Sequence, residues 1–152
     1  VERSRGLGDV YKRQDFIQDQ ITLLADIKNL PKIMEWVRIH LRYTPFSSFD
    51  AMKIEIALEE VVVNIMQYAY LEEKGDIEIN FTYSFKEIVI SIIDQGIPFN
   101  PIKNLPTTKP ERPLEEQSEG GLGLIFINKI MDEMHYERKH LYNILILKKY
   151  CL

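Results

Sequence analysis

The middle of the chain holds the feature that most limits its fold: two segments, about residues 76–84 and 87–93, in which apolar and polar residues alternate. Such alternation is typical of a β-strand with one buried face. Gly75-Asp76 turns the chain into the first segment, and Ser84-Phe85-Lys86 joins it to the second. Strands joined by so short a connection pair antiparallel. We therefore expect a sheet rich in antiparallel pairs.

A strand and a helix are predicted near the start of the chain. Ile21–Ala25 is a short β-prone run. Asp26 or Asn29, followed by Pro31, supplies the polar cap and the early proline of a helix start. Tyr43-Thr-Pro45 stops that helix.

A second, longer helix starts at Ser47-Ser48 and runs to about Tyr70. Its apolar residues cover more than one stripe, so it should be largely buried. After the strand pair, one more helix and two strands are expected, with a turn near His140-Leu141 between the strands; they span about residues 121–133, 134–139 and 142–149.

Two stretches fall outside this regular pattern. Residues 1–14 lack helical or strand periodicity and resemble translated adaptor sequence, so we interpret them as a non-native or disordered leader; a genuine floppy N-terminus is the alternative. Residues 100–119 are polar and rich in proline, which is typical of a functional lid or of disorder. Residues 15–152 are expected to form one α+β domain, a two-layer sandwich with helices on one face of a mainly antiparallel sheet.

Composition excludes several classes of function. The chain has 152 residues, 45% of them hydrophobic, which suffices for one domain with a core. A formal net charge of -4 argues against broad binding to nucleic acid. Cys151 is the sole cysteine, and the three histidines are not at metal-ligand spacing. No apolar run approaches the roughly 20 residues that cross a bilayer. We expect a soluble, cytoplasmic protein without nucleic-acid or membrane partners.

Glu60 and Asn64 form the first candidate site. They are four residues apart on a predicted helix, so their side chains project side by side, in one row with Ile56 and Tyr68. A carboxylate can take a proton from a hydroxyl, and an amide oxygen suits Mg²⁺. An ordinary polar stripe has the same spacing. Asn64 lies in the most apolar part of the helix, where an idle buried amide would cost roughly 2–7 kcal/mol, which favours a function.

Asp94 and the turn after it form the second candidate site. Alternation puts Asp94 on the face of the even-numbered isoleucines of its strand, which must be the helix-covered face if Asp94 is to reach a pocket. A carboxylate there can accept a hydrogen bond from an exocyclic amine such as adenine N6. Gly96 gives a base room to approach, and Pro98-Phe99 stiffens the exit. Asp-x-Gly is also good turn chemistry by itself.

Gly120, Gly121 and Gly123 form the third, at the opening of an apolar helix. Backbone N–H groups there, with the helix dipole, form a cradle for phosphate. The Walker pattern is absent, and the dinucleotide pattern would follow a strand in a βαβ unit. A flexible hinge between lid and helix is the alternative, and both readings can hold together.

In this order and spacing, the three motifs resemble the GHKL ATPase superfamily, whose small ATP-binding domain the chain matches over about residues 20–150. It looks most like the anti-sigma-factor serine-protein kinase (RsbW-like) branch. Two departures stand out: Tyr68 replaces a usual histidine, and Tyr142-Asn143 stands in the last strand where relatives frequently have Gly-Asn/Thr-Thr. The residues that carry the resemblance are Glu60 and Asn64, Gln67-Tyr-Ala-Tyr70, Asp94-x-Gly96-x-Pro98-Phe99, and Gly120-Gly-Leu-Gly-Leu124.

The resemblance implies a role for each position, with ATP and Mg²⁺ as cofactors. Glu60 matches a general base that activates a serine hydroxyl, and Asn64 a magnesium ligand. Asp94 matches the acid that recognises adenine. The other implied cofactor-binding positions are Gly96, Pro98, Phe99, Gly120, Gly121, Leu122, Gly123, Leu124 and Asn143, with Lys109 or Arg112 of the lid near the γ-phosphate.

The function implied by the resemblance is a serine protein kinase. It would hold a sigma factor or similar regulator and phosphorylate a serine on a small anti-anti-sigma (STAS-type) protein. A non-catalytic ATP-binding module and a detached histidine-kinase catalytic domain are the alternatives. Glu60 favours catalysis, because binding alone does not need a base.

A homodimer is also expected. The odd-numbered positions Val89, Ile93, Leu145 and Leu147 make the second face of the sheet apolar. With helices on one side only, this face would be exposed to water, and exposed patches of that kind usually mark an interface.

Overall fold

The computed structural model describes residues 16–102 and 119–151, with side chains for residues 17–102 and 125–151. The predicted leader, residues 1–14, and most of the predicted lid, with Lys109 and Arg112, lie outside the described residues. The start and end of that lid segment, at Asn100 and Glu119, are described.

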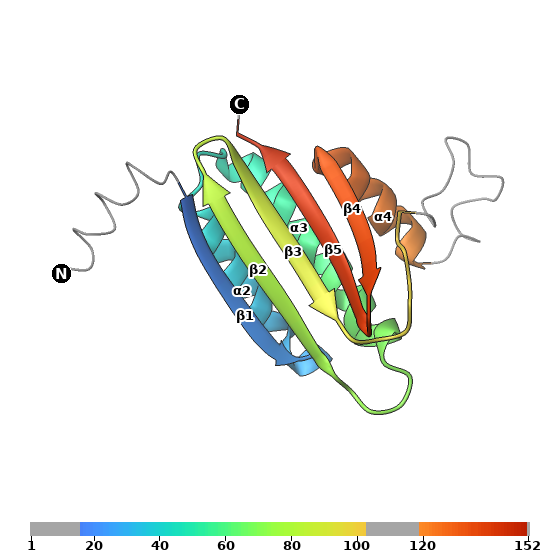
Figure 1. The fold of residues 1–152 in the computed structure, drawn as a ribbon. Helices are drawn as coiled ribbons and strands as arrows, with labels where there is room; N and C mark the ends of the chain where they lie inside the picture. Colours follow the sequence, from blue (N-terminus) through green and yellow to red (C-terminus); the bar gives the residue numbers. More distant parts are fainter. Residues whose placement is uncertain (1–15, 103–118, 152) are drawn as a thin grey trace.

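A five-stranded sheet has its helices on one face, and every pair of neighbouring strands is antiparallel (Figure 1). The strand order is β1-β2-β3-β5-β4. The strands are β1 (Phe16–Leu24), β2 (Asp76–Ser84), β3 (Glu87–Asp94), β4 (Glu133–Lys139) and β5 (Tyr142–Tyr150). The helices are η1 (Ile27–Asn29), α2 (Leu30–Leu41), α3 (Ser48–Asn64), η2 (Ile65–Ala69) and α4 (Glu119–Ile130). The predicted two-layer α+β sandwich is confirmed.

One of the two candidate caps near the first helix makes a capping hydrogen bond. The Asp26 carboxylate accepts the N–H of Lys28 at 3.0 Å and starts the short helix η1. Asn29 precedes α2, which carries Pro31 in its first turn, but its side chain does not cap the helix and donates to the Leu24 carbonyl instead. Ser47 caps α3 as predicted, because its hydroxyl accepts the N–H of Asp50 at 3.1 Å.

The long helix ends at the predicted place, but its last turn is a π-helix, η2. The carbonyls of Met66 and Ala69 in this turn accept hydrogen bonds from Lys74 Nζ and Ile97 N, which lie outside the helix. Partners of this kind satisfy carbonyls that have no intrahelical partner at a helix end. The wider turn is therefore held by tertiary contacts, which the apolar pattern of the sequence does not reveal.

Two element boundaries differ from the prediction. β1 starts at Phe16 rather than Ile21. The sequence pattern did not predict its first residues, because polar residues such as Gln18 and Gln20 are exposed on this edge strand and interrupt the apolar alternation. α4 spans residues 119–130 rather than 121–133. It ends earlier because Asp132 N already donates to Lys148 O at 2.9 Å, which draws the chain toward β4.

The core lies between the sheet and the helices, and it contains the even-numbered residues of β3. Ile88, Ile90 and Ile92 are fully buried there. Leu145 and Leu147 of β5 pair with Ile92 and Ile90 and are buried on the same face. Their predicted place on the open face was therefore wrong. The error arose because β3 and β5 are antiparallel with odd residues of one opposite even residues of the other.

The open face still carries apolar residues in its centre. Ile93 pairs with Ile144, and Ile146 pairs with Ser91. Four apolar residues of this face, all half-buried, form what we call the open-face patch: Val89, Ile93, Ile144 and Ile146.

Candidate functional site

Four elements reach the same end of the sheet and carry the three predicted motifs. Asp94 is the last residue of β3, and Asn143 of β5 is its register partner. η2, which continues α3 beyond Asn64, ends beside the loop after β3, where Ile97 N donates to Ala69 O at 2.9 Å. The last residues of α4 lead into β4 at the opposite end of the sheet. The first residues of α4 therefore lie toward the end that holds Asp94 (Figure 1).

Asp94 is buried and anchored through one carboxylate oxygen. Its side chain lies on the helix-covered face, as predicted, and the residue is 6% exposed. Oδ1 accepts the N–H of Gly96 at 2.8 Å and a hydrogen of Asn143 Nδ2 at 2.9 Å. Among the described residues, no hydrogen bond ends on Oδ2. One oxygen thus fixes the carboxylate, and the other remains an acceptor.

The electrostatic balance at Asp94 depends on these donors. Burial raises the pKa of Asp94 above its ordinary value, because the charged carboxylate loses hydration. The hydrogen bonds from Asn143 and Gly96 and the positive charge of Arg138 act in the opposite direction. These three contacts offset part of the effect of burial, and the net shift of the Asp94 pKa is upward.

Asn143 serves Asp94 and the loop after it. Its Nδ2 donates both to Asp94 Oδ1 and to the carbonyl of Ile97, at 2.9 and 2.8 Å. Its Oδ1 accepts the hydroxyl of Tyr136 at 2.5 Å. Both N–H donors are thus occupied by protein acceptors. The predicted assignment of Asn143 to the cofactor accordingly becomes a positioning role in our proposal below.

The loop after Asp94 is also held from two other sides. Arg138 Nη1 donates to the Gly96 carbonyl at 2.9 Å. The hydroxyl of Tyr70 accepts the N–H of Gln95 at 2.8 Å and donates to the carbonyl of Asp76 at 2.6 Å. A loop held by β4, β5 and the end of η2 is well suited to present a backbone edge to a ligand.

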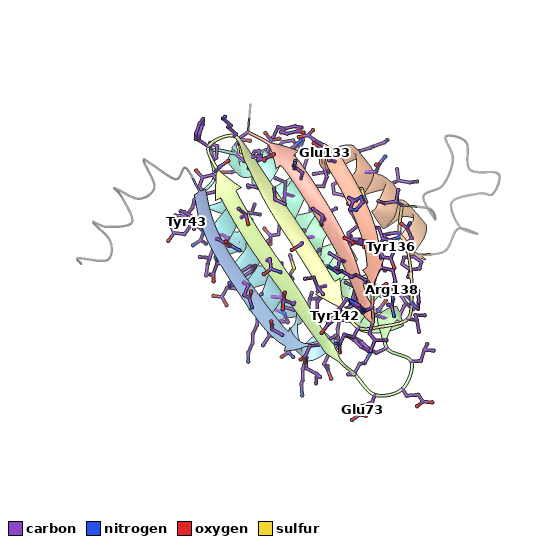
Figure 2. The ribbon with its side chains drawn as sticks, viewed as in Figure 1. Tyr43, Glu73, Glu133, Tyr136, Arg138 and Tyr142 are labelled. Atoms are coloured by element: carbon purple, nitrogen blue, oxygen red, sulfur yellow. The ribbon has the colours of Figure 1, made fainter. Side chains whose placement is uncertain are left out.

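Tyr136 and Arg138 were not among the predicted site residues. Figure 2 shows both on β4, close to the end of the sheet that holds Asp94. The register places Arg138 opposite Asn143 and Tyr136 opposite Leu145. The predicted turn near His140-Leu141 could have identified both residues. Pairing residues outward from a tight turn places Arg138 opposite Asn143 and Tyr136 opposite Leu145.

The row of Glu60 and Asn64 lies at the edge of the buried stripe of α3. Both residues are half-buried, while Ile56 and Tyr68 of the same row are 46% and 55% exposed. The prediction of a largely buried helix is therefore wrong for this row, because the sheet covers only one side of α3. Since Asn64 is only half-buried, the cost of burying an idle amide no longer favours a function for this residue. The buried residues of α3 are Ile54, Ala57, Leu58, Val61 and Val62.

The residues present still suit a magnesium ion. In the part of the chain that the structure describes, no hydrogen bond occupies the side chain of Asn64. No cluster of three His, Cys, Asp or Glu side chains suited to a metal occurs among the described residues. Mg²⁺ at nucleotide sites keeps several waters and is commonly held by one or two carboxylates together with substrate phosphates. An asparagine side chain can also hold Mg²⁺ at sites of phosphoryl transfer, and Asn64 could do so here.

The glycine motif lies at the start of α4, as predicted. α4 packs against α3, and Ile127 in its second half and Met131 just after its end are buried in the core. The first N–H groups of a helix have no intrahelical partner, so this end can receive an anion. The side chains of Leu122 and Leu124 lie outside the described residues.

The remaining predicted positions lie on the surface. Pro98 is exposed and Phe99 is 49% exposed. After them, Asn100 Oδ1 accepts the N–H of Ile102 at 2.9 Å, which closes a turn. His40, one of the three histidines, contacts the Trp36 carbonyl through Nδ1 at 2.8 Å and Asp19 Oδ2 through Nε2 at 2.9 Å.

A cavity of about 320 Å³ lies at the far end of α3 from Asn64. It opens between α2 and the first half of α3, next to the ion pair of Arg38 with Glu55 at 2.6 Å. It shares no residue with the Asp94 site. No described helix is both long and apolar enough to cross a bilayer.

The chain belongs to the histidine kinase-like ATPase domain family. The sequence profile of that family matches residues 23–149, from the end of β1 almost to the end of β5. The predicted GHKL-type fold and the class of protein are thereby confirmed.

Relatives with assigned names are similar to part of the chain. The serine-protein kinase RsbW of Bacillus mycoides (strain KBAB4) is 35% identical over 92 residues, which is 59% of this chain and 58% of the relative. The serine-protein kinase RsbW of Bacillus cereus (strain AH187) is 35% identical over 95 residues, 60% of this chain and 59% of the relative. The match thus spans less than two thirds of either relative.

Two solved structures share the fold. The RsbU and RsbW domains of Rv1364c from Mycobacterium tuberculosis align with a TM-score of 0.61 and 18% identity, over 88% of this chain and 32% of that one. The SiaB-SiaC complex from Pseudomonas aeruginosa aligns with a TM-score of 0.54 and 16% identity, over 96% of both chains. At these identities the likeness concerns the fold alone.

Proposed function

We propose that this chain binds Mg-ATP and acts as an anti-sigma-factor-like serine protein kinase. It holds a sigma factor or similar regulator and phosphorylates a serine of a small STAS-type antagonist. The relatives named serine-protein kinase RsbW support the kinase assignment. The SiaB-SiaC complex supports a protein partner for this fold. Such a function belongs in the cytoplasm, where ATP and sigma factors act.

One observation carries the nucleotide assignment: Asp94 is buried, fixed through Oδ1 and left with an acceptor oxygen. Adenine offers an N6 amine to such an acceptor, whereas guanine offers a carbonyl oxygen, which repels it. The Gly96 N–H donates to Asp94 Oδ1 at 2.8 Å, so the backbone of the loop lies beside the same carboxylate. The proposed pocket therefore selects adenine by hydrogen-bond polarity.

The other assigned residues supply phosphate binding and proton transfer. The glycine-rich start of α4 receives the phosphates, and Asn64 holds Mg²⁺, which neutralises phosphate charge. Glu60, one helical turn before Asn64, takes the proton of the acceptor serine. Positioning and charge neutralisation are most of what phosphoryl transfer needs.

A two-stage experiment tests the proposal. Calorimetry with Mg-ATP comes first, on the wild type and on Asp94→Asn, which we expect to bind ATP at least about tenfold more weakly because the amide brings a donor toward the amine. Wild type without ATP binding overturns the proposal.

The second stage assays transfer to serine on STAS-type proteins from the same genome. We expect phosphoserine with the wild type, its loss in Glu60→Ala, and its retention in the matched control Glu59→Ala, whose side chain is exposed on the neighbouring face. ATP binding without phosphoserine in any of these would favour the non-catalytic module. Phosphohistidine in its place would favour the histidine-kinase alternative.

A homodimer through the open-face patch completes the proposal. Four apolar residues in the centre of an otherwise polar sheet face provide the contact.

A further inference from the structure

Tyr136 has no part in the function proposed above, yet its hydroxyl ends in the hydrogen-bond network of Asp94. Three neighbouring strands contribute to this network: Tyr136 from β4, Asn143 from β5 and Asp94 from β3. The links are short, with Tyr136 Oη 2.5 Å from Asn143 Oδ1 and Asn143 Nδ2 2.9 Å from Asp94 Oδ1. In Figure 2, Tyr136 lies on the edge strand beside Arg138.

The direction of every hydrogen bond in this network is determined. The Nδ2 side of Asn143 faces two groups that can only accept in their ordinary ionisation state, the Asp94 carboxylate and the Ile97 carbonyl. The amide nitrogen must therefore lie on that side and the amide oxygen on the other. An amide oxygen only accepts, so the Tyr136 hydroxyl donates. The tyrosine proton is thus committed to Asn143.

We propose that Tyr136 is a positioning residue for base specificity: its O–H locks the Asn143 amide so that Asn143 gives Asp94 a donor, which keeps Asp94 an acceptor toward a 6-amino purine. This inference rests on the proposed nucleotide-binding function of the Asp94 site. It concerns a residue of β4 that does not itself touch the carboxylate.

The reason lies in what the amide does when the lock is removed. Without the tyrosine hydroxyl, Asn143 Oδ1 loses its hydrogen bond, and the amide is held only through Nδ2. A less firmly held amide is a weaker donor to Asp94 Oδ1, and that donor is one of the contacts that lower the pKa of Asp94 against the effect of burial. A proton on Oδ2 then costs less free energy, while Oδ1 goes on accepting from Gly96 and Asn143. With a proton on Oδ2, Asp94 can donate to a 6-keto purine.

The test compares ATP with inosine triphosphate, in which a 6-keto group replaces the 6-amino group. Calorimetry on the full chain gives the ratio of the two dissociation constants. We expect Tyr136→Phe, which removes one hydroxyl, to reduce the preference for ATP by about threefold to tenfold, the range of one neutral hydrogen bond. The matched control is Tyr142→Phe: Tyr142 is exposed at the start of β5 and should leave the ratio unchanged (Figure 2).

A second measurement tests the lock without any nucleotide. In protein labelled with ¹⁵N at asparagine, the side-chain NH₂ signals of Asn143 are assigned by their absence in Asn143→Ala. We expect slow hydrogen exchange for these signals in wild type and Tyr142→Phe, and exchange about tenfold faster or more in Tyr136→Phe. Thermal unfolding confirms that each variant is folded.

The outcomes separate the two claims. Wild type that binds neither nucleotide overturns the proposed function and the specificity role with it, and the exchange rates then show whether the lock exists. Wild type that prefers ATP, with an equal preference in Tyr136→Phe and Tyr142→Phe, overturns the role of Tyr136 and leaves the proposed function intact.

Discussion

Gly96 lies against the backbone of Ala69: a Cβ on residue 96 would stand 2.4 Å from the Ala69 carbonyl oxygen and 2.6 Å from its Cβ. The same carbonyl accepts the N–H of Ile97 at 2.9 Å. Gly96 does not have a positive φ, so the close contact, and not a left-handed backbone, requires glycine here. This contact joins the end of the α3–η2 helix to the turn that holds Asp94.

Gly96→Ala should lower the free energy of unfolding by about 1–3 kcal/mol, the usual range for overpacking a filled site. It should also weaken ATP binding, because the turn must move away from η2. Urea unfolding and calorimetry measure the two effects. Adding Ala69→Gly should not restore either one, since the nearest atom is a backbone oxygen that this change leaves in place. Full rescue by the double variant would contradict the contact.

Tyr70→Phe tests the hydrogen bonds of the Tyr70 hydroxyl, which contacts Gln95 after β3 and Asp76 at the start of β2. Burial, the largest cause, raises the pKa of Tyr70, and Asp94 and Asp76 add to it, while the Gln95 hydrogen bond lowers it. The folded state thus holds the phenol proton more tightly than the unfolded state. Wild-type stability should therefore fall as pH rises above about 10, the ordinary tyrosine value, through the higher pKa of the folded state.

The expected result is that the stability difference between wild type and Tyr70→Phe narrows as the pH is raised above that value. Urea unfolding at a series of pH values measures it. Tyr68→Phe is the matched control, because it removes an exposed hydroxyl from the same turn. A difference that stays constant or widens would count against the Tyr70 contacts.

Asn143→Ala should lower stability by roughly 1–3 kcal/mol at neutral pH, because a buried carboxylate loses a donor. The pKa of Asp94, already raised by burial, should rise further. The folded state then binds the proton more tightly than the unfolded state, so stability falls as pH rises through the window from the ordinary aspartate value to the folded one.

Acidification should accordingly reduce the cost of Asn143→Ala, as measured by urea unfolding between neutral and mildly acidic pH. Asn80→Ala is the matched control: it removes an amide that donates to Glu78 at 2.9 Å on the open face of the sheet. A cost that does not shrink relative to this control would contradict the role of Asn143 at Asp94.

Ile93→Lys tests the proposed dimer. The new ammonium would lie opposite Glu78, so the monomer tolerates it, while the open-face patch loses a central residue. Light scattering should give two chains of 17.9 kDa for the wild type and one for the variant. Thr22→Lys is the matched control, because it faces the same Glu78 from β1, outside the patch. A variant that remains dimeric would exclude this surface.

Much of the fold was predictable from local patterns. The strands at residues 76–84 and 87–94 follow from alternation, and Ser47 and Asp26 follow from capping chemistry, because these signals lie within a few residues of one another. Burial of Asp94 on the helix-covered face also follows from alternation. β1 was only half predictable, since an edge strand exposes polar residues on both faces.

The site was predictable in its motifs and not in its geometry. The order of the Glu60–Asn64 pair, the Asp94 turn and the glycines of α4 is a property of the sequence, and it indicated the ATPase domain family that the profile match then confirmed. Hydrogen-bond polarity is different, because it depends on which atoms face each other across strands. Asp94, Asn143 and Tyr136 are neighbours only because β3, β5 and β4 lie side by side. The strand order and the contact of Ala69 in the π-helix η2 with Gly96 both join residues that are far apart in the sequence. Only the tertiary structure therefore decides them.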